Sequence, residues 1–152
     1  MDDLYSELPM PLDRRIEVLY VEDSAGEVLI MRQILREFLQ PVNLSIVHDG
    51  AQALAMLANE CLKPDLIILD LNLPVLSGFE VLERNQRRDV PIVVFTASTR
   101  EGDMEKTLSL GAREYVQKPV DLRRYRDAVV GMVCKWTMVG RTDRNVPDPE
   151  PE

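Results

Sequence analysis

The chain has 152 residues, 45% of them apolar, which is enough for one domain that buries a core without disulfides. Twenty-six acidic and eighteen basic residues leave a net charge of −8, which repels polyanions, so we expect no direct nucleic-acid binding. Cys61 and Cys134 lack metal-type spacing and fit a reducing compartment. No segment has the pattern of an export signal or a membrane span, and we expect a cytoplasmic protein.

Both ends of the chain look unstructured. Residues 1–14 are acidic, contain two prolines and show no periodicity, so we expect a flexible leader. Residues 139–152 contain three prolines and almost no apolar side chains, so we expect a disordered acidic tail. The single domain is therefore expected over residues 15–138.

Strands and helices alternate through the first half of the domain. We expect a strand over residues 16–21, and the capping-box spacing of Ser24 and Glu27 predicts a helix that continues to residue 39. A second strand at 44–47 and a second helix at 51–61 follow. The helical side chains expected in the core are Val28, Met31, Leu35 and Leu39, then Leu54, Leu57 and Ala58.

The second half continues the alternation. We expect strands at 66–69, 91–95 and 114–117. The helices are expected at 79–88, in a short segment that stops at Gly111, and at 122–138. The last helix is expected to pack through Leu122, Tyr125, Val129, Met132 and Trp136. Five alternating pairs predict an α/β fold, a doubly wound parallel sheet with helices on both faces, and we expect the flavodoxin-like strand order 2-1-3-4-5.

Chemically matched residues follow four of these strands. Glu22 and Asp23 follow the first, Asp70 the third, Thr96 the fourth and Lys118 the fifth. In parallel sheets ligands bind beyond the carboxyl ends of the strands, so these side chains are expected to converge. Clustered carboxylates repel each other unless a cation intervenes, and hard oxygen ligands suit Mg²⁺.

Such a site is suited to phosphoryl transfer. A carboxylate can attack phosphorus, and the metal and Lys118 would offset the charge of the phosphoryl group. The hydroxyl of Thr96 can donate a hydrogen bond to a phosphoryl oxygen. We therefore predict that Asp70 forms an aspartyl phosphate.

Residues 16–138 resemble the receiver domains of two-component response regulators, including single-domain, chemotaxis-regulator-like members. The matching residues are Glu22-Asp23, Asp70-Leu71-Asn72-Leu73-Pro74 with Gly78, Thr96-Ala97, Tyr115 and Lys118-Pro119. The stretch from Val129 to Trp136 is also similar to that of the small regulators paired with bacterial phytochromes, and so is the lone-domain layout that we expect. The resemblance implies a signalling protein that catalyses only its own phosphorylation and dephosphorylation.

The resemblance also assigns ligands. It implies transfer from a sensor histidine kinase to Asp70, with Mg²⁺ held by Asp23, Asp70 and the backbone carbonyl of Asn72. Glu22 would act through water or as an added ligand. Asn72 and Ser98 match positions that tune the lifetime of the phosphoryl group in the family.

Thr96 and Tyr115 match the switch pair of the family. On phosphorylation the hydroxyl moves toward the phosphoryl group and the ring turns inward, which changes the surface of the fourth helix, fifth strand and last helix. The bond between Lys118 and Pro119 matches one that is cis in the family. We expect the signal to leave through protein contacts.

Each residue also has an ordinary role. Glu22 and Asp23 could cap the next helix, Lys118 could be a loop charge, and Tyr115 could pack on the sheet. Their joint placement favours the site. His48 lies at a turn and is expected to be a surface residue.

Alternative functions remain open. One is a relay intermediate that passes phosphate to a histidine phosphotransfer protein. Another is a phosphatase of the haloacid dehalogenase type, but its Asp-x-Asp motif lies on the first strand, whereas Asn72 follows the third strand here. Beyond its core stripe, the last helix carries Val130, Val133, Cys134 and Met138. This second apolar side favours a homodimer through this helix and neighbouring elements, a thicker core, or cover by the tail.

Overall fold

The computed structural model describes residues 14–138, so the predictions for the tail and for all but the last residue of the leader lie outside the described residues. The elements are β1 Ile16–Val21, α1 Ala25–Arg36, β2 Val42–Val47, α2 Gly50–Ala58, β3 Leu66–Leu69, α3 Gly78–Arg84, β4 Ile92–Thr96, α4 Asp103–Ser109, β5 Glu114–Gln117 and α5 Leu122–Val133, followed by the π-helical turn Cys134–Met138.

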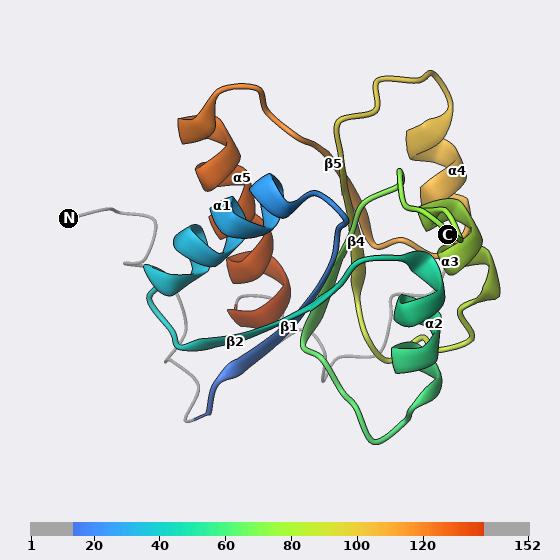
Figure 1. Ribbon diagram of the computed structural model, residues 1–152, viewed down its shortest axis with the longest axis horizontal. Helices are drawn as coiled ribbons and strands as arrows, with labels where there is room; N and C mark the ends of the chain where they lie inside the picture. Colours follow the sequence, from blue (N-terminus) through green and yellow to red (C-terminus); the bar gives the residue numbers. More distant parts are fainter. Residues whose placement is uncertain (1–13, 139–152) are drawn as a thin grey trace, which may run out of the picture.

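The five strands form one parallel sheet in the order β2-β1-β3-β4-β5, and the predicted flavodoxin-like fold is confirmed. In Figure 1, α1 and α5 cover one face of the sheet, and α2, α3 and α4 cover the other. The helices within residues 14–138 are all too short or too polar to cross a membrane.

The core has two halves, one on each face of the sheet, because alternate strand residues point to opposite faces. Val18 and Tyr20 of β1 pack against α1 and α5. Leu19 and Val21 belong to the cluster that includes α2 and α3. The central strand β3 is buried on both faces, which explains its uninterrupted apolar sequence.

The prediction that a residue lies in the core is wrong for three residues, and all three lie at or beyond helix ends. Leu39 is 51% exposed because α1 ends at Arg36, and Phe38 takes the buried place after it. Leu122 is 63% exposed at the first position of α5. Ala58, the last residue of α2, is exposed. A helical stripe predicts burial only while the helix continues against the sheet.

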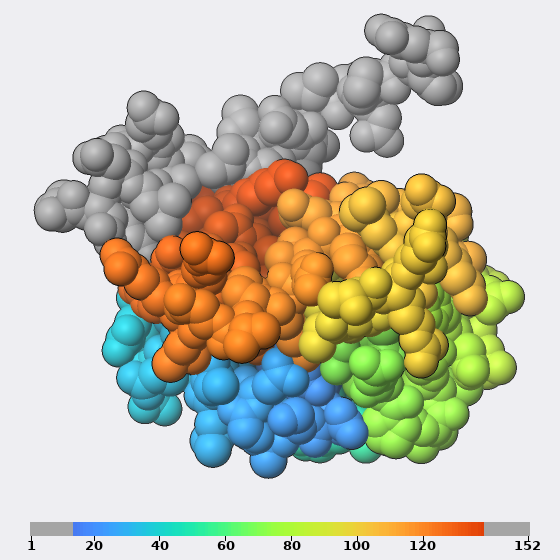
Figure 2. Space-filling model, turned by 90° about the horizontal axis from the view of Figure 1, so that it is seen from above, coloured from blue at the N-terminus to red at the C-terminus, as the bar shows by residue number. Residues whose placement is uncertain are grey.

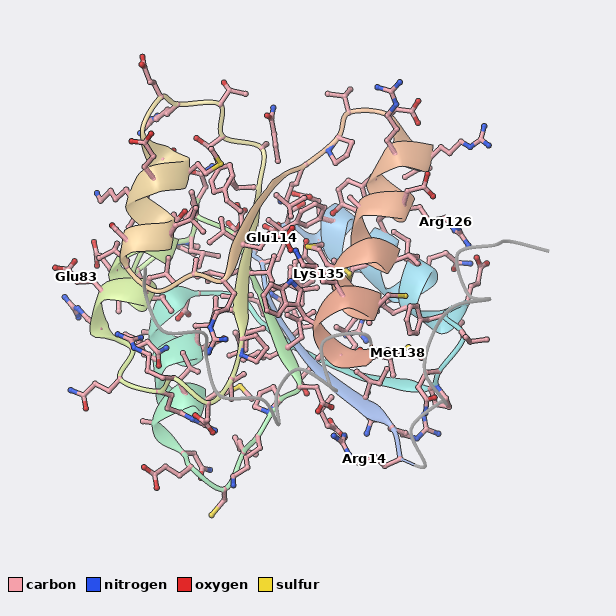
Figure 3. All side chains as sticks on the ribbon, turned by 180° about the vertical axis from the view of Figure 1, so that it is seen from behind. Arg14, Glu83, Glu114, Arg126, Lys135 and Met138 are labelled. Carbon is pink, nitrogen blue, oxygen red and sulfur yellow. The ribbon has the colours of Figure 1, made fainter. Side chains whose placement is uncertain are left out.

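The second apolar side of the last helix is buried, so the premise of an exposed dimerisation stripe is wrong. Val130, Val133, Cys134 and Met138 all belong to the core cluster of the α1 and α5 face. The turn Cys134–Met138 after α5 is fixed by Glu114 of β5, which accepts a hydrogen bond from Trp136 Nε1 at 2.8 Å. Glu114 also pairs with Lys135 at 3.4 Å (Figure 3). The thicker core, which was one of the alternatives, fits this packing.

Candidate functional site

The strand register brings the predicted residues to one edge of the sheet. Val21 pairs with Leu69, and the amide of Asp70 donates to the carbonyl of Val21 at 3.2 Å, so Glu22 and Asp70 lie at the same level. The amide of Lys118 donates to the carbonyl of Thr96 at 2.7 Å. Viewed from above in Figure 2, the segments that follow β1, β3, β4 and β5 meet on this face.

Asp70 is held by the loop that follows it. Its Oδ1 accepts from the amide of Leu71 at 2.8 Å and faces the amide of Asn72 at 3.5 Å. The loop turns back so closely that a Cβ on Gly78 would lie 2.5 Å from the carbonyl oxygen of Asp70. The carboxylate is therefore oriented by backbone groups, and Oδ2 faces the rest of the site.

Glu22, Asp23 and Asp70 form a carboxylate cluster in which one oxygen from each side chain lies within 4.8 Å of the other two. Glu22 and Asp70 are buried, whereas Asp23 is exposed. Buried like charges at this spacing raise each other's energy, and a divalent cation relieves the repulsion. The donor set consists of hard oxygens beside solvent, which fits Mg²⁺ with several retained waters.

Glu22 is fully engaged by protein donors. Its Oε1 accepts from the Tyr20 hydroxyl at 3.2 Å and from Lys118 Nζ at 2.7 Å, while Oε2 accepts from the amides of Asp23 and Ser24 at 3.1 and 3.3 Å. A carboxylate offers about four acceptor positions. Direct metal ligation by Glu22 would displace a donor, so contact through water fits better than an added ligand. Burial raises the pKa of Glu22 to about 7, against the opposing hydrogen bond from Lys118.

Lys118 reaches the cluster from β5, two strands from Asp70. Its ammonium lies 2.7 Å from Glu22, 2.8 Å from Glu27 and 3.6 Å from Asp70 Oδ2. Burial lowers the pKa of Lys118, but the hydrogen bonds to Glu22 and Glu27 outweigh it and raise the pKa above the ordinary value. Lys118 is therefore a permanent positive charge at the site.

Glu27 is a residue that the sequence assigned only to helix capping. The expected capping box is half formed: Ser24 Oγ accepts from the amide of Glu27 at 3.3 Å, but the Glu27 carboxylate does not return to the Ser24 amide, which donates to Glu22. Instead, it binds Lys118 and accepts from the Tyr125 hydroxyl at 3.0 Å. The local spacing of the sequence could not have indicated either partner, because Lys118 and Tyr125 both lie more than ninety residues from Glu27.

Thr96 and Tyr115 are connected through Ser98. The buried Thr96 hydroxyl accepts from the amide of Ser98 at 3.2 Å, and the Tyr115 hydroxyl donates to the carbonyl of Ser98 at 2.9 Å. Ser98 also donates from its own hydroxyl to Asp103 at 2.6 Å, which ties the loop to α4. A movement of either Thr96 or Tyr115 therefore acts on the same loop.

Two further expectations concern the surroundings of the site. Residues 14–138 contain no cis peptide bond, so the cis bond expected before Pro119 is wrong here. The trans form is favoured before proline by about 0.5–1 kcal/mol in the absence of other constraints. His48 is exposed, as expected, and its Nδ1 lies 3.2 Å from the backbone oxygen of Glu22.

Comparison with known proteins places this geometry in a family context. The sequence model of the response regulator receiver domain matches residues 18–130. Response regulator Rcp1 of Synechocystis is 34% identical over 128 residues, covering 78% of this chain and 87% of Rcp1. Other curated relatives are much longer, and the chain spans only 8%, 36% and 40% of three of them.

Two solved structures have the same fold. The phosphorylated cyanobacterial phytochrome response regulator RcpA superposes with a TM-score of 0.73 at 30% identity, covering 81% of this chain and 94% of RcpA. The Mn²⁺-bound form of Rcp1 gives a TM-score of 0.72 at 32% identity, covering 80% of this chain and 94% of that one.

Proposed function

We propose, because this chain belongs to the response regulator receiver domain family, that it accepts a phosphoryl group on Asp70 from a sensor histidine kinase and signals through protein contacts. The observation that supports this best is the convergence of Asp70, Asp23 and Lys118 at one sheet edge. Members of this family are signalling proteins, and we propose that this chain acts as a regulator in the cytoplasm. The match to response regulator Rcp1, 87% of which the chain covers, supports a stand-alone role.

The proposed transfer needs little beyond positioning and charge. Oδ2 of Asp70 attacks phosphorus in line with the bond to the donor's imidazole nitrogen, a P–O bond forms as the P–N bond breaks, and the nitrogen leaves with the electron pair. Lys118, already 3.6 Å from this oxygen, stabilises the charge of the phosphoryl group. The Thr96 hydroxyl would donate to another phosphoryl oxygen.

We also propose that Asp23, Asp70 and the backbone carbonyl of Asn72 would hold Mg²⁺, and that Glu22 would contact it through water. When bound, Mg²⁺ would neutralise part of the charge on the transferring group. Supporting structures in the family include the Mn²⁺-bound Rcp1 and a Pseudomonas aeruginosa kinase receiver domain with magnesium in its cleft.

For output, we propose that Thr96 and Tyr115 act as the switch and that the surface of α4, β5 and α5 carries the signal. Met104 and Leu108 of α4 are 51% and 42% exposed one helical turn apart, which supports a contact surface there. Dimerisation through α5 stays a prediction, and any contact there would have to use residues other than its buried second apolar side. Light scattering with and without phosphorylation would measure it.

The likeness to RcpA and Rcp1 supports a phytochrome as the kinase partner, since the name of RcpA describes a phytochrome response regulator. The relay alternative differs in its outcome: phosphate on Asp70 would move onto a histidine phosphotransfer protein. Incubation of the phosphorylated protein with such a partner separates the two.

Intact mass spectrometry after incubation with Mg²⁺ and acetyl phosphate tests the main proposal. The wild type should gain the mass of one phosphoryl group, and Asp70→Asn should not. Asp65→Asn is the matched control, because Asp65 flanks the same strand β3 and is equally buried at 6%. Unmodified wild type, or modified Asp70→Asn, would contradict the assignment.

A further inference from the structure

In this structure the ammonium of Lys118 is bound more closely by two other carboxylates than by Asp70. Glu22 and Glu27 lie 2.7 and 2.8 Å away, at hydrogen-bond distance, whereas Asp70 lies at 3.6 Å. Both carboxylate oxygens of Glu27 lie 2.8 Å from the ammonium, so together with Glu22 Oε1 three oxygens occupy its three donors. The proposed phosphoryl contact therefore requires Lys118 to redirect a donor that another carboxylate now holds.

The two carboxylates differ in how easily they can release the lysine. The Glu22 side chain is only 1% exposed, so losing its cation would leave a buried charge unpaired. The Glu27 side chain is 29% exposed and lies in the first turn of α1, where water and the helix dipole stabilise an unpaired carboxylate. Glu27 is therefore the partner that Lys118 can exchange at lower cost.

Tyr125 fixes Glu27 in this role. Its hydroxyl donates to Glu27 Oε1 at 3.0 Å, and its ring packs edge-on to Phe95 with centroids 5.0 Å apart. Tyr125 belongs to α5, so the lysine, the first turn of α1 and α5 are joined through one carboxylate. The Ser24 amide is already taken by Glu22, so it does not compete for Glu27.

We propose that Glu27 is a positioning residue that, held by Tyr125, restrains Lys118 in a resting position and slows phosphoryl transfer to Asp70. This inference rests on the proposed phosphorylation of Asp70. Transfer exchanges the Glu27 contact of Lys118 for a phosphoryl oxygen. The released Glu27 and Tyr125 then report the modification to α5.

Phosphorylation rates with acetyl phosphate at saturating Mg²⁺ test the proposal. Glu27→Gln removes the charged acceptor and should raise the rate about tenfold, the range expected for a hydrogen bond between charged groups. Tyr125→Phe keeps every charge of the site but frees Glu27, and should raise the rate about threefold. Glu27→Asp keeps the charge and should return the rate toward that of the wild type.

Glu80→Gln is the matched control for removing a carboxylate. Glu80 occupies the same place in the first turn of α3, behind the Ser77 cap, as Glu27 does behind Ser24. Its substitution should leave the rate within about twofold, because only remote charge changes. The Mg²⁺ affinity of Tyr125→Phe, measured by calorimetry, should equal that of the wild type.

Equal acceleration by Glu27→Gln and Glu80→Gln, with no effect of Tyr125→Phe, would overturn the proposal in favour of a general charge effect. Unchanged or slower transfer in Glu27→Gln would also overturn it. If the wild type itself takes no phosphoryl group on Asp70, the proposed function fails and this inference with it. A phosphorylated wild type with unresponsive variants would refute the inference alone.

Discussion

The carbonyl oxygen of Asp70 lies so close to the α-carbon of Gly78 that no side chain fits between them: a Cβ there would approach the oxygen to 2.5 Å. The same contact brings the start of α3 against the loop that follows Asp70, since the amide of Gly78 donates to the carbonyl of Leu71 at 3.0 Å. The position of Asp70 therefore depends on a residue with no functional group.

We expect Gly78→Ala to lower the free energy of unfolding by about 1–3 kcal/mol, because the added methyl group meets backbone atoms that cannot rotate away. Gly131→Ala is the control. Gly131 lies within α5, and a Cβ added there would have no atom within 4 Å. Alanine should therefore stabilise the protein by up to about 1 kcal/mol. Urea unfolding measures both. Equal effects of the two substitutions would disprove the close contact.

Val75 carries backbone strain beside the site. Its φ of 69° lies in the left-handed region, which costs a side-chain-bearing residue about 1–2 kcal/mol, and the side chain is 76% exposed. Val75→Gly should therefore raise the free energy of unfolding by about 1 kcal/mol. Val120→Gly, at a fully exposed valine without positive φ, should not stabilise the protein. A destabilised Val75→Gly protein would argue against strain in this loop.

Lys118 should be important for stability as well as for chemistry. Lys118→Met leaves Glu22 buried without its cation, and we expect a loss of about 3–5 kcal/mol in the free energy of unfolding. Lys135→Met removes a lysine that is 58% exposed and pairs with Glu114, so its loss should stay below about 1 kcal/mol. Adding Glu22→Gln to Lys118→Met should recover part of the stability. No recovery would mean that the buried charge is not the cause.

Mg²⁺ should stabilise the fold by relieving the repulsion among Glu22, Asp23 and Asp70. At a concentration ten times the dissociation constant, binding to the folded state alone adds about 1.4 kcal/mol. Differential scanning fluorimetry should show a rise in Tm with Mg²⁺ that an equal ionic strength of KCl does not produce. Asp23→Asn should abolish this rise. A rise that persists in Asp23→Asn would place the cation elsewhere.

The two cysteines should differ in reactivity. Cys61 is exposed, whereas Cys134 is buried, and burial raises the pKa of the Cys134 thiol. One equivalent of a thiol reagent should react rapidly with the native protein and a second only after denaturation, because the thiolate is the reactive form. Cys61→Ser should remove the rapid phase. Rapid reaction of Cys134 would show that the end of α5 opens in solution.

The local pattern of the sequence determined the elements and their order. Apolar runs of β-branched residues ended at Glu22, Asp70 and Thr96, and parallel strands place their carboxyl ends at one edge, so the pattern alone predicted which residues would meet. The points at which the apolar stripes of the helices leave the core were less predictable. Leu39 and Leu122 follow the helical period, but Leu39 lies after the end of α1 and Leu122 is the first residue of α5, and both are exposed.

Only the tertiary structure decided how the charges at the site are shared. Whether Glu27 caps its own helix or binds Lys118 depends on contacts that span more than ninety residues, and the spacing of Ser24 and Glu27 is the same in both cases. Likewise, the burial of Val130 and Met138 depends on how α5 and the turn after it pack on the sheet. Local periodicity specifies secondary structure, but competition among distant partners for the same carboxylate is decided only when the chain is folded.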